Sequence, residues 1–149
     1  MTPCFRLSSG AHPSNSGAGA SVYGGRWNPL GVEVIYTAAT ALLAALEVLV
    51  HFSVLPRDFV LTEIHIPASV FIQSVSERDL PSDWQSLGLS RSTQKIGRRW
   101  TAELRSAILS VPLAIIPSER NYVLNPHHPD FGQIRFLAPA PFRFDPRLK

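Results

Sequence analysis

The stretch VEVIYTAATALLAALEVLVHF, from Val32 to Phe52, contains the two patterns that decide the class of fold. Its first seven residues are rich in β-branched and aromatic side chains, which favours a strand from Val32 to Ala38. The run that follows predicts a helix from about Ala41 to Phe52, with Thr37 or Thr40 as its N-cap. The sequence therefore places a short strand directly before an apolar helix.

Further elements are predicted on the C-terminal side of this unit. FVLTEIHIP, from Phe59 to Pro67, alternates its side chains as a strand does. Helical spacing is expected from about Ser92 to Ser106, and AILSVPLAIIP (Ala107 to Pro117) is expected to be a strand that Pro112 bulges or confines to an edge. Because these elements do not alternate regularly, residues 1–149 are predicted to form one α+β domain with a mixed, mainly antiparallel sheet core and flanking helices.

Two segments are expected to have little regular structure. SSGAHPSNSGAGAS, from Ser8 to Ser21, is small, polar and rich in glycine, so it is interpreted as a loop within the domain. QIRFLAPAPFRFD, from Gln133 to Asp145, is expected to be extended and interrupted by two prolines.

Composition excludes several classes of protein. With 45% hydrophobic and 17% charged residues in 149, the chain is typical of a globular domain with one core. No apolar run approaches the roughly 20 residues of a membrane helix, and the N-terminus lacks a secretory hydrophobic region. Cys4 is the only cysteine, so no internal disulfide can form. A cytoplasmic protein that contacts no membrane is the simplest interpretation.

The net charge of +3 is mild, and Gly97 to Arg99 contains the only basic pair. Direct nucleic-acid binding usually requires a denser basic cluster with aromatic residues between, so it is not expected. A small anionic ligand or an acidic protein partner agrees better with this charge.

The stretch YGGRWNPLG, from Tyr23 to Gly31, suggests a phosphate-binding turn. Gly24 and Gly25 allow a ligand to approach the backbone, and Arg26 offers a planar fork of donors that matches phosphate oxygens. Trp27 could stack on a ring or belong to the core. The alternative is an ordinary hairpin turn with a solvated arginine, and neither a Walker-type loop nor G-x-G-x-x-G is present.

Glu47 and Tyr36 are the other candidates for chemistry in this half of the chain. Glu47 lies in a helix with apolar neighbours on nearly every side, where an unpaired carboxylate would cost several kcal/mol. It must therefore reach a partner or a cleft, unless it shares a narrow exposed stripe with His51. Tyr36 offers a ring face and a hydroxyl, although taken singly it could be an ordinary strand aromatic.

NYVLNPHHPD, from Asn121 to Asp130, could suggest a zinc site made by His127, His128 and Asp130. Adjacent histidines rarely point the same way, and no second ligand pair has suitable spacing, so no metal is expected. Turn formation around Asn125-Pro126 is the favoured interpretation.

Taken together, these motifs resemble the RES domain. The resemblance rests on GGRWNPLGVEVIYTAATALLAALEVLVH (Gly24 to His51) and VPLAIIPSERNYVLNPHHPDF (Val111 to Phe131), and it extends from FRLSSG at Phe5 to FRFDPRL at Leu148. RES domains are the toxin halves of bacterial toxin–antitoxin pairs. Their fold is similar to that of ADP-ribosyltransferases, and they consume NAD⁺.

The resemblance implies that Arg26, Tyr36 and Glu47 are the catalytic residues. It implies NAD⁺ as substrate, without a metal, bound by seven residues: Gly24, Gly25, Arg26, Trp27, Asn28, Tyr36 and Asn125. The family serine follows Val-Pro, where this chain has Leu113; Ser118 is not the matching position.

The activity implied is cleavage of the nicotinamide–ribose bond, with ADP-ribose passed to water, phosphate or a protein. Transfer to one specific cellular enzyme is an alternative. A catalytically weak binding module is another, because of Leu113.

The resemblance also implies a partner. This would be an antitoxin with a helix-turn-helix-like domain and a C-terminal segment that blocks the active site, and a homodimer within the complex is allowed. The basic pI of about 9.5 would complement an acidic partner.

Overall fold

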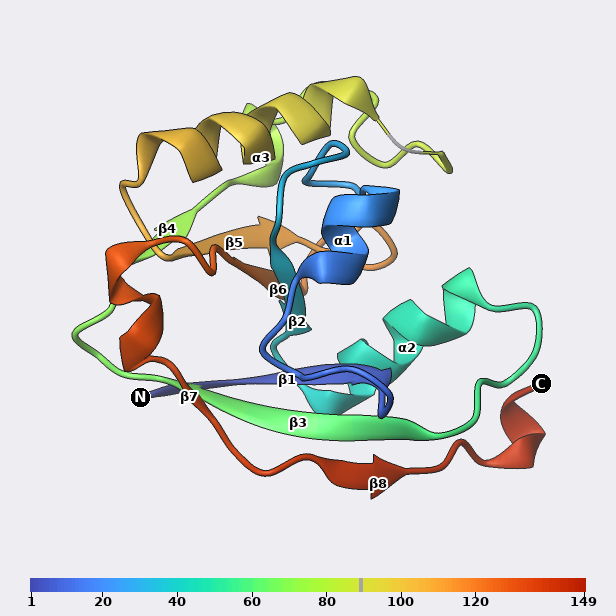
Figure 1. The fold of residues 1–149 in the computed structure, drawn as a ribbon. Helices are drawn as coiled ribbons and strands as arrows, with labels where there is room; N and C mark the ends of the chain where they lie inside the picture. Colours follow the sequence, from blue (N-terminus) through green and yellow to red (C-terminus); the bar gives the residue numbers. More distant parts are fainter. Residues whose placement is uncertain (89) are drawn as a thin grey trace.

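A curled sheet forms the body of the protein in the computed structural model, which describes residues 1–88 and 90–149 (Figure 1). The strands follow the order β4-β5-β6-β2-β1-β3-β7, and β8 also pairs with β3. Their bounds are β1 (Thr2–Ser9), β2 (Ile35–Ala38), β3 (Phe59–Ile66), β4 (Ile72–Ser74), β5 (Ile108–Pro112), β6 (Arg120–Leu124), β7 (Arg135–Phe136) and β8 (Ala140–Phe142).

In residues 1–88 and 90–149, three α-helices and three short 3₁₀ helices accompany the sheet. They are α1 (Ala18–Tyr23), α2 (Ala41–His51) and α3 (Arg91–Glu103), with η1 (Glu77–Asp79), η2 (Pro129–Gln133) and η3 (Pro146–Leu148). Among the described strands, only β4 and β5 pair in parallel, and the other pairings are antiparallel. The predicted α+β domain with a mixed, mainly antiparallel sheet is therefore confirmed.

The strand and helix predicted from Val32 to Phe52 are present as β2 and α2. Thr40 is the N-cap, and its side-chain oxygen accepts a hydrogen bond from the Leu43 N–H at 3.1 Å. The cap satisfies a backbone donor that a helix start leaves free. Strand β2 is shorter than predicted and begins at Ile35.

Two expectations about local structure are wrong. The segment from Ser8 to Ser21 that was interpreted as a loop contains the start of α1. A side chain outside the helix holds it, because the Asn28 amide donates a hydrogen bond to Ala20 O at 2.8 Å. Strand β5 is not at an edge, because it lies between β4 and β6. Pro112 is tolerated because it is the last residue of that strand and lies beyond the pairing with β4, which ends at Ser110.

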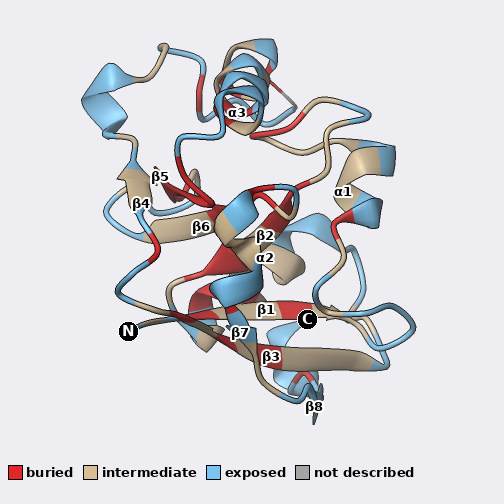
Figure 2. Ribbon diagram, turned by 60° about the vertical axis from the view of Figure 1, so that its left-hand side comes forward, coloured by how far each residue is buried: buried red, intermediate tan, exposed pale blue. Residues whose placement is uncertain are grey.

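Two helices cover different parts of the sheet. Helix α2 packs on β1 and β2 through a cluster that contains Leu7, Leu43 and Ala44. A second cluster contains Trp27, Trp84 and, on α3, Trp100, and it packs on Leu109 and Val111 of β5 and Val123 of β6. Strand β5 is buried along its whole length (Figure 2). No helix in residues 1–88 or 90–149 has the length and apolar character needed to span a membrane.

Helix α3 touches the turn before β2 directly. A Cβ atom added to Gly97 would lie 1.5 Å from the Trp27 carbonyl oxygen, so only glycine permits this contact. The backbone next to Arg26 is therefore positioned by a helix about 70 residues further along the chain.

Candidate active site

A cleft of about 650 Å³ lies where β1, β2, β6, α2 and the turn after α1 meet. This volume is within the roughly 300–1,000 Å³ that is usual for small-molecule sites. A second hollow, of about 620 Å³, lies between Leu55–Phe59 and Pro141–Pro146 and contains none of the residues predicted to be functional. The first cleft is therefore the candidate site.

The structure brings most of the predicted site residues to this one cleft. Its lining includes Gly24, Gly25, Arg26, Trp27, Tyr36 and Glu47. Two predicted ligands, Asn28 and Asn125, are not part of the lining and are almost completely buried.

Arg26 carries its charge into the cleft without a carboxylate partner among the described residues. Its two terminal nitrogens donate to the carbonyl oxygens of Trp84 at 2.7 Å and Ser86 at 3.1 Å. Carbonyl oxygens orient a guanidinium without neutralising it, and the fork has five N–H groups. Arg26 therefore keeps its charge and has further N–H donors for a ligand. Its two hydrogen bonds also fix the position of the loop that contains Leu87 and Gly88, two other lining residues.

The double glycine is required by the way the turn folds back on Tyr36. A Cβ on Gly25 would lie 2.6 Å from the Tyr36 hydroxyl oxygen, and Gly24 has a φ of 73°. The Tyr36 hydroxyl donates to Asn28 Oδ1 at 2.5 Å and accepts from the Trp27 N–H at 3.1 Å. Asn28 and the Tyr36 hydroxyl thus hold the shape of the turn.

Burial changes the chemistry of Tyr36. Desolvation raises the pKa of its hydroxyl far above the ordinary value of 10.0, against smaller lowering effects from its hydrogen bonds and from Arg26. Tyr36 therefore stays neutral at physiological pH. With its hydroxyl engaged in the turn, what Tyr36 offers the cleft is its ring.

Glu47 projects from α2 toward β6 and keeps 30% of its side chain exposed. Its Oε1 accepts a hydrogen bond from Asn121 Nδ2 at 3.2 Å, and its Oε2 lies 3.7 Å from His51 Nε2. The nearby Glu47 carboxylate raises the pKa of His51, against a smaller lowering effect of burial. The carboxylate therefore has a neutral donor on one oxygen and a titratable partner on the other.

Arg6 and Asn121 are lining residues with polar side chains that sequence reasoning did not single out. One guanidinium nitrogen of Arg6 donates to the carbonyl oxygens of Ser14 at 2.5 Å and Ser16 at 2.9 Å. Burial lowers the pKa of Arg6, which has no carboxylate partner among the residues described. A single charged residue in the strand Thr2–Ser9 was the available signal for Arg6.

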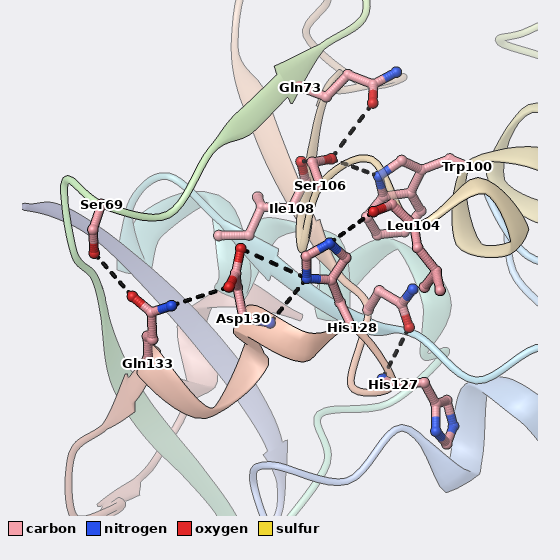
Figure 3. A network of polar contacts seen from close by, with 11 residues as sticks. Ser69, Gln73, Trp100, Leu104, Ser106, Ile108, His127, His128, Asp130 and Gln133 are labelled. Atoms are coloured by element: carbon pink, nitrogen blue, oxygen red, sulfur yellow. Dashed lines mark hydrogen bonds and ion pairs between the residues drawn. The ribbon is translucent and has the colours of Figure 1, made fainter.

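His127 and His128 belong to a separate polar region, shown in Figure 3. We call Ser69, His128, Asp130 and Gln133 the turn network. The His128 ring lies between Leu104 O at 2.9 Å and the Asp130 N–H at 3.0 Å, and Gln133 joins Asp130 to Ser69. Asn125 Oδ1 accepts from the His127 N–H at 3.0 Å, which is the expected turn chemistry.

No group of three or more histidine, cysteine, aspartate or glutamate side chains in residues 1–88 and 90–149 is arranged to hold a metal ion.

Leu113, which occupies the place of the family serine, is buried with 1% exposure. Its side chain belongs to the apolar cluster with Leu43 and Ala44 beneath α2. Its neighbours Pro112 and Ala114 line the cleft, but Leu113 does not.

The RES domain family model matches residues 3–145 of this sequence. The chain belongs to the RES domain family. The match includes every residue that lines the cleft.

Two named relatives match this chain over most of their own length and most of its length. The chain is 42% identical over 136 residues to "Toxin Res" of Photorhabdus laumondii subsp. laumondii, covering 89% of this chain and 86% of the relative. It is 37% identical over 137 residues to the "Prs ADP-ribosylating toxin" of Sphingobium sp. (strain YBL2), covering 89% and 85%.

Among solved structures, the fold is similar to a chain in the crystal structure of the M. tuberculosis MbcT–MbcA toxin–antitoxin complex. The TM-score is 0.79 at 19% identity, over 94% of this chain and 83% of that chain. This agreement establishes that the curled mixed sheet is shared.

Proposed function

We propose that this RES domain is the toxin of a toxin–antitoxin pair and that it cleaves the nicotinamide–ribose bond of NAD⁺. The observation that carries the proposal is that Arg26, Tyr36 and Glu47 line a single cleft in a chain of this family. NAD⁺ acts as substrate in this proposal, and the reaction needs no metal.

In the proposed reaction the bond between the ribose C1′ and the nicotinamide nitrogen breaks, and both bonding electrons leave with neutral nicotinamide. The ribose carbon then has oxocarbenium character, which a nearby carboxylate stabilises, as in glycoside hydrolysis. Glu47 is the carboxylate in the cleft. The acceptor forms the new bond to C1′ and releases its proton.

The charge of the cleft supports a ligand with two phosphates. Arg6 and Arg26 both line it, and neither has a carboxylate partner in the described part of the chain. A diphosphate carries two negative charges at neutral pH, and guanidinium forks match phosphate oxygens. We assign Arg26 to the pyrophosphate, with Arg6 as an additional cation, and the Tyr36 ring to stacking on nicotinamide.

Gly24, Gly25 and the backbone of Trp27 allow the ligand to approach closely. We assign no direct contact with NAD⁺ to Asn28 or Asn125. Their side-chain amides form hydrogen bonds with backbone groups, and neither residue lines the cleft.

A protein acceptor is the second candidate function. It is favoured by the 37% identity to a relative named as an ADP-ribosylating toxin of Prs. The first step would be the same, and a nucleophilic side chain of the target would bond to C1′ instead of water or phosphate. The catalytically weak alternative rests on Leu113, whose side chain packs in the apolar cluster beneath α2 and does not line the cleft.

The mouth of the cleft supports docking of an antitoxin segment. Four apolar lining residues are exposed, namely Val50, Phe52, Leu87 and Ile115, with exposed fractions of 40% or more. An inhibitory segment would cover them and offer an acidic group to Arg26 in place of a phosphate. Similarity of the fold to MbcT–MbcA supports this partner class.

Mass spectrometry of the products from NAD⁺ tests the proposal. Purified protein is incubated with NAD⁺ in buffer, then with phosphate, then with cell lysate, and Glu47→Gln is the control. We expect nicotinamide release in at least one condition, with free ADP-ribose, a phosphorylated ADP-ribose or a labelled protein band identifying the acceptor. Absence of nicotinamide in all three conditions contradicts the proposal.

A further inference from the structure

We propose that Asn121 is a positioning residue that holds the Glu47 carboxylate in its reactive orientation. The inference rests on the proposed function, because it assigns a second residue to the same step. Neither the spacing of the motifs nor the family pattern used above singled out Asn121 rather than Asn125.

The first support is geometric. Asn121 lies in β6 between two neighbouring strands, opposite Ala38 of β2 and Val111 of β5. Its amide Nδ2 donates to Glu47 Oε1 at 3.2 Å, across the cleft from sheet to helix. A donor fixed in the middle of a sheet restricts the rotation of the longer glutamate side chain, and it leaves Oε2 available to the ribose.

The second support is the orientation of the amide. Asn121 Oδ1 is buried and has no hydrogen-bond partner among the described residues. Turning the amide over would direct Oδ1 at the carboxylate, where two acceptors would repel each other. The contact with Glu47 therefore sets the orientation of Asn121 at the expense of an unsatisfied acceptor, which lowers folding stability. A polar group that stabilises the fold so poorly is typical of a functional site.

The third support comes from the other charged and titratable groups that face Glu47. His51, on the same helix, is exposed and lies near Oε2. Tyr36 on β2 is engaged with Asn28, Arg26 with the loop carbonyls, and Arg6 on β1 with Ser14 and Ser16. Within residues 1–88 and 90–149, Asn121 is the donor that holds Oε1.

The test uses three variants of the full chain. Asn121→Leu removes both amide groups at similar volume, Asn121→Asp keeps the shape but replaces the donor by a carboxylate, and Tyr122→Phe is the matched control on the adjacent position of β6. We expect kcat for nicotinamide release to fall about 10- to 100-fold in both Asn121 variants, as for loss of a hydrogen bond to a charged group, with KM for NAD⁺ within about threefold. Tyr122→Phe should keep the kcat of the wild type.

Two readouts separate positioning from a structural role. The melting temperature of Asn121→Leu should be equal to or above that of the wild type, because the unsatisfied acceptor is gone. In Asn121→Asp the acid limb of the kcat profile should move to higher pH, because a second negative charge favours protonation of Glu47.

A carboxyl-carbon NMR titration of Glu47 measures the contact without NAD⁺. In Asn121→Leu, which removes the donor and adds no charge, the midpoint should move to higher pH than in the wild type. An unchanged midpoint, or an Asn121→Leu kcat within threefold of the wild type, overturns the inference. If the wild type releases no nicotinamide, the proposed function fails, while the titration still decides whether Asn121 controls the Glu47 carboxylate.

Discussion

The cleft and the turn network both contain polar side chains, but these side chains differ in whether their hydrogen bonds are satisfied. In the turn network, His128 has a partner on each ring nitrogen and Gln133 joins two further side chains. Among the described residues, the buried side-chain polar atoms that lack a partner are Ser8 Oγ and Asn121 Oδ1, and both residues line the cleft. Satisfied polar groups stabilise a fold, whereas unsatisfied ones keep capacity for a ligand.

The largest expected effect comes from the cleft. Glu47→Gln should lower nicotinamide release about 10²- to 10³-fold, as for loss of one preorganised electrostatic contact to the developing charge. Its stability should change by less than about 1 kcal/mol, because the side chain is partly exposed. Product analysis with a parallel thermal melt measures both. Activity within tenfold of the wild type would mean that Glu47 is not a catalytic residue.

The next effect concerns the contact beneath the cleft. Gly97→Ala should destabilise the fold by about 3 kcal/mol, because the new methyl group overlaps the Trp27 carbonyl. Gly132→Ala, beside the turn network, is the matched control, since a Cβ there meets nothing within 4 Å. Urea unfolding of both variants gives the two free energies. Equal stabilities would show that α3 does not rest on the turn that carries Arg26.

A smaller effect is expected in the turn network. His128→Ala leaves Leu104 O and the Asp130 N–H without their side-chain partner, and should cost about 1–3 kcal/mol of stability. The kcat of the folded protein should stay within about twofold of the wild type. Urea unfolding and steady-state kinetics, performed on the same preparation, separate the two quantities. If His128→Ala lost much of its kcat while keeping the stability of the wild type, the turn network would contribute to catalysis as the cleft does.

The smallest effect concerns His51. Its pKa is raised by Glu47, so the pair stabilises the fold fully below the unfolded value of about 6.5, and this contribution is lost as pH rises through the higher folded value. Because the His51 side chain is 72% exposed, the contribution should be below about 1 kcal/mol.

His51→Gln should therefore flatten the dependence of unfolding free energy on pH between about 5.5 and 8.5, relative to the wild type. His12→Gln, at an exposed histidine, serves as control. A slope that is the same in His51→Gln and wild type would show that the pair with Glu47 does not persist in solution.

Local chemistry made part of the fold predictable. The Thr40 cap and the β-branched run before it specify β2 and α2, because both signals act within a few residues. The same signals could not reveal α1, since its six residues are held by distant groups: Asn28 donates to Ala20 O, and the Gly31 N–H donates to Ser21 O. Helices this short are marginal without such contacts.

Local sequence signals made part of the candidate site predictable as well. Arg26, Tyr36 and Glu47 come from one continuous segment, so the strand and helix prediction already brings them near each other. The choice between Asn121 and Asn125 depends on strand register, which pairs Asn121 with Ala38 and Val111. Register between distant strands is not encoded in local spacing.

The contacts of the cleft divide the chain unevenly. Residues 24–51 contain the arginine, the tyrosine ring and the carboxylate, and Asn28 and Trp27 within this segment hold Tyr36. The groups that hold Arg26, Gly25 and Glu47 are contributed by Trp84, Ser86, Gln94 and Asn121. A chain cut in the connection between α2 and β3 would therefore have its reactive side chains in one piece and their supports in the other. Each piece should be harmless alone, so this junction is where a split form of the protein, active only on reassembly, would be made.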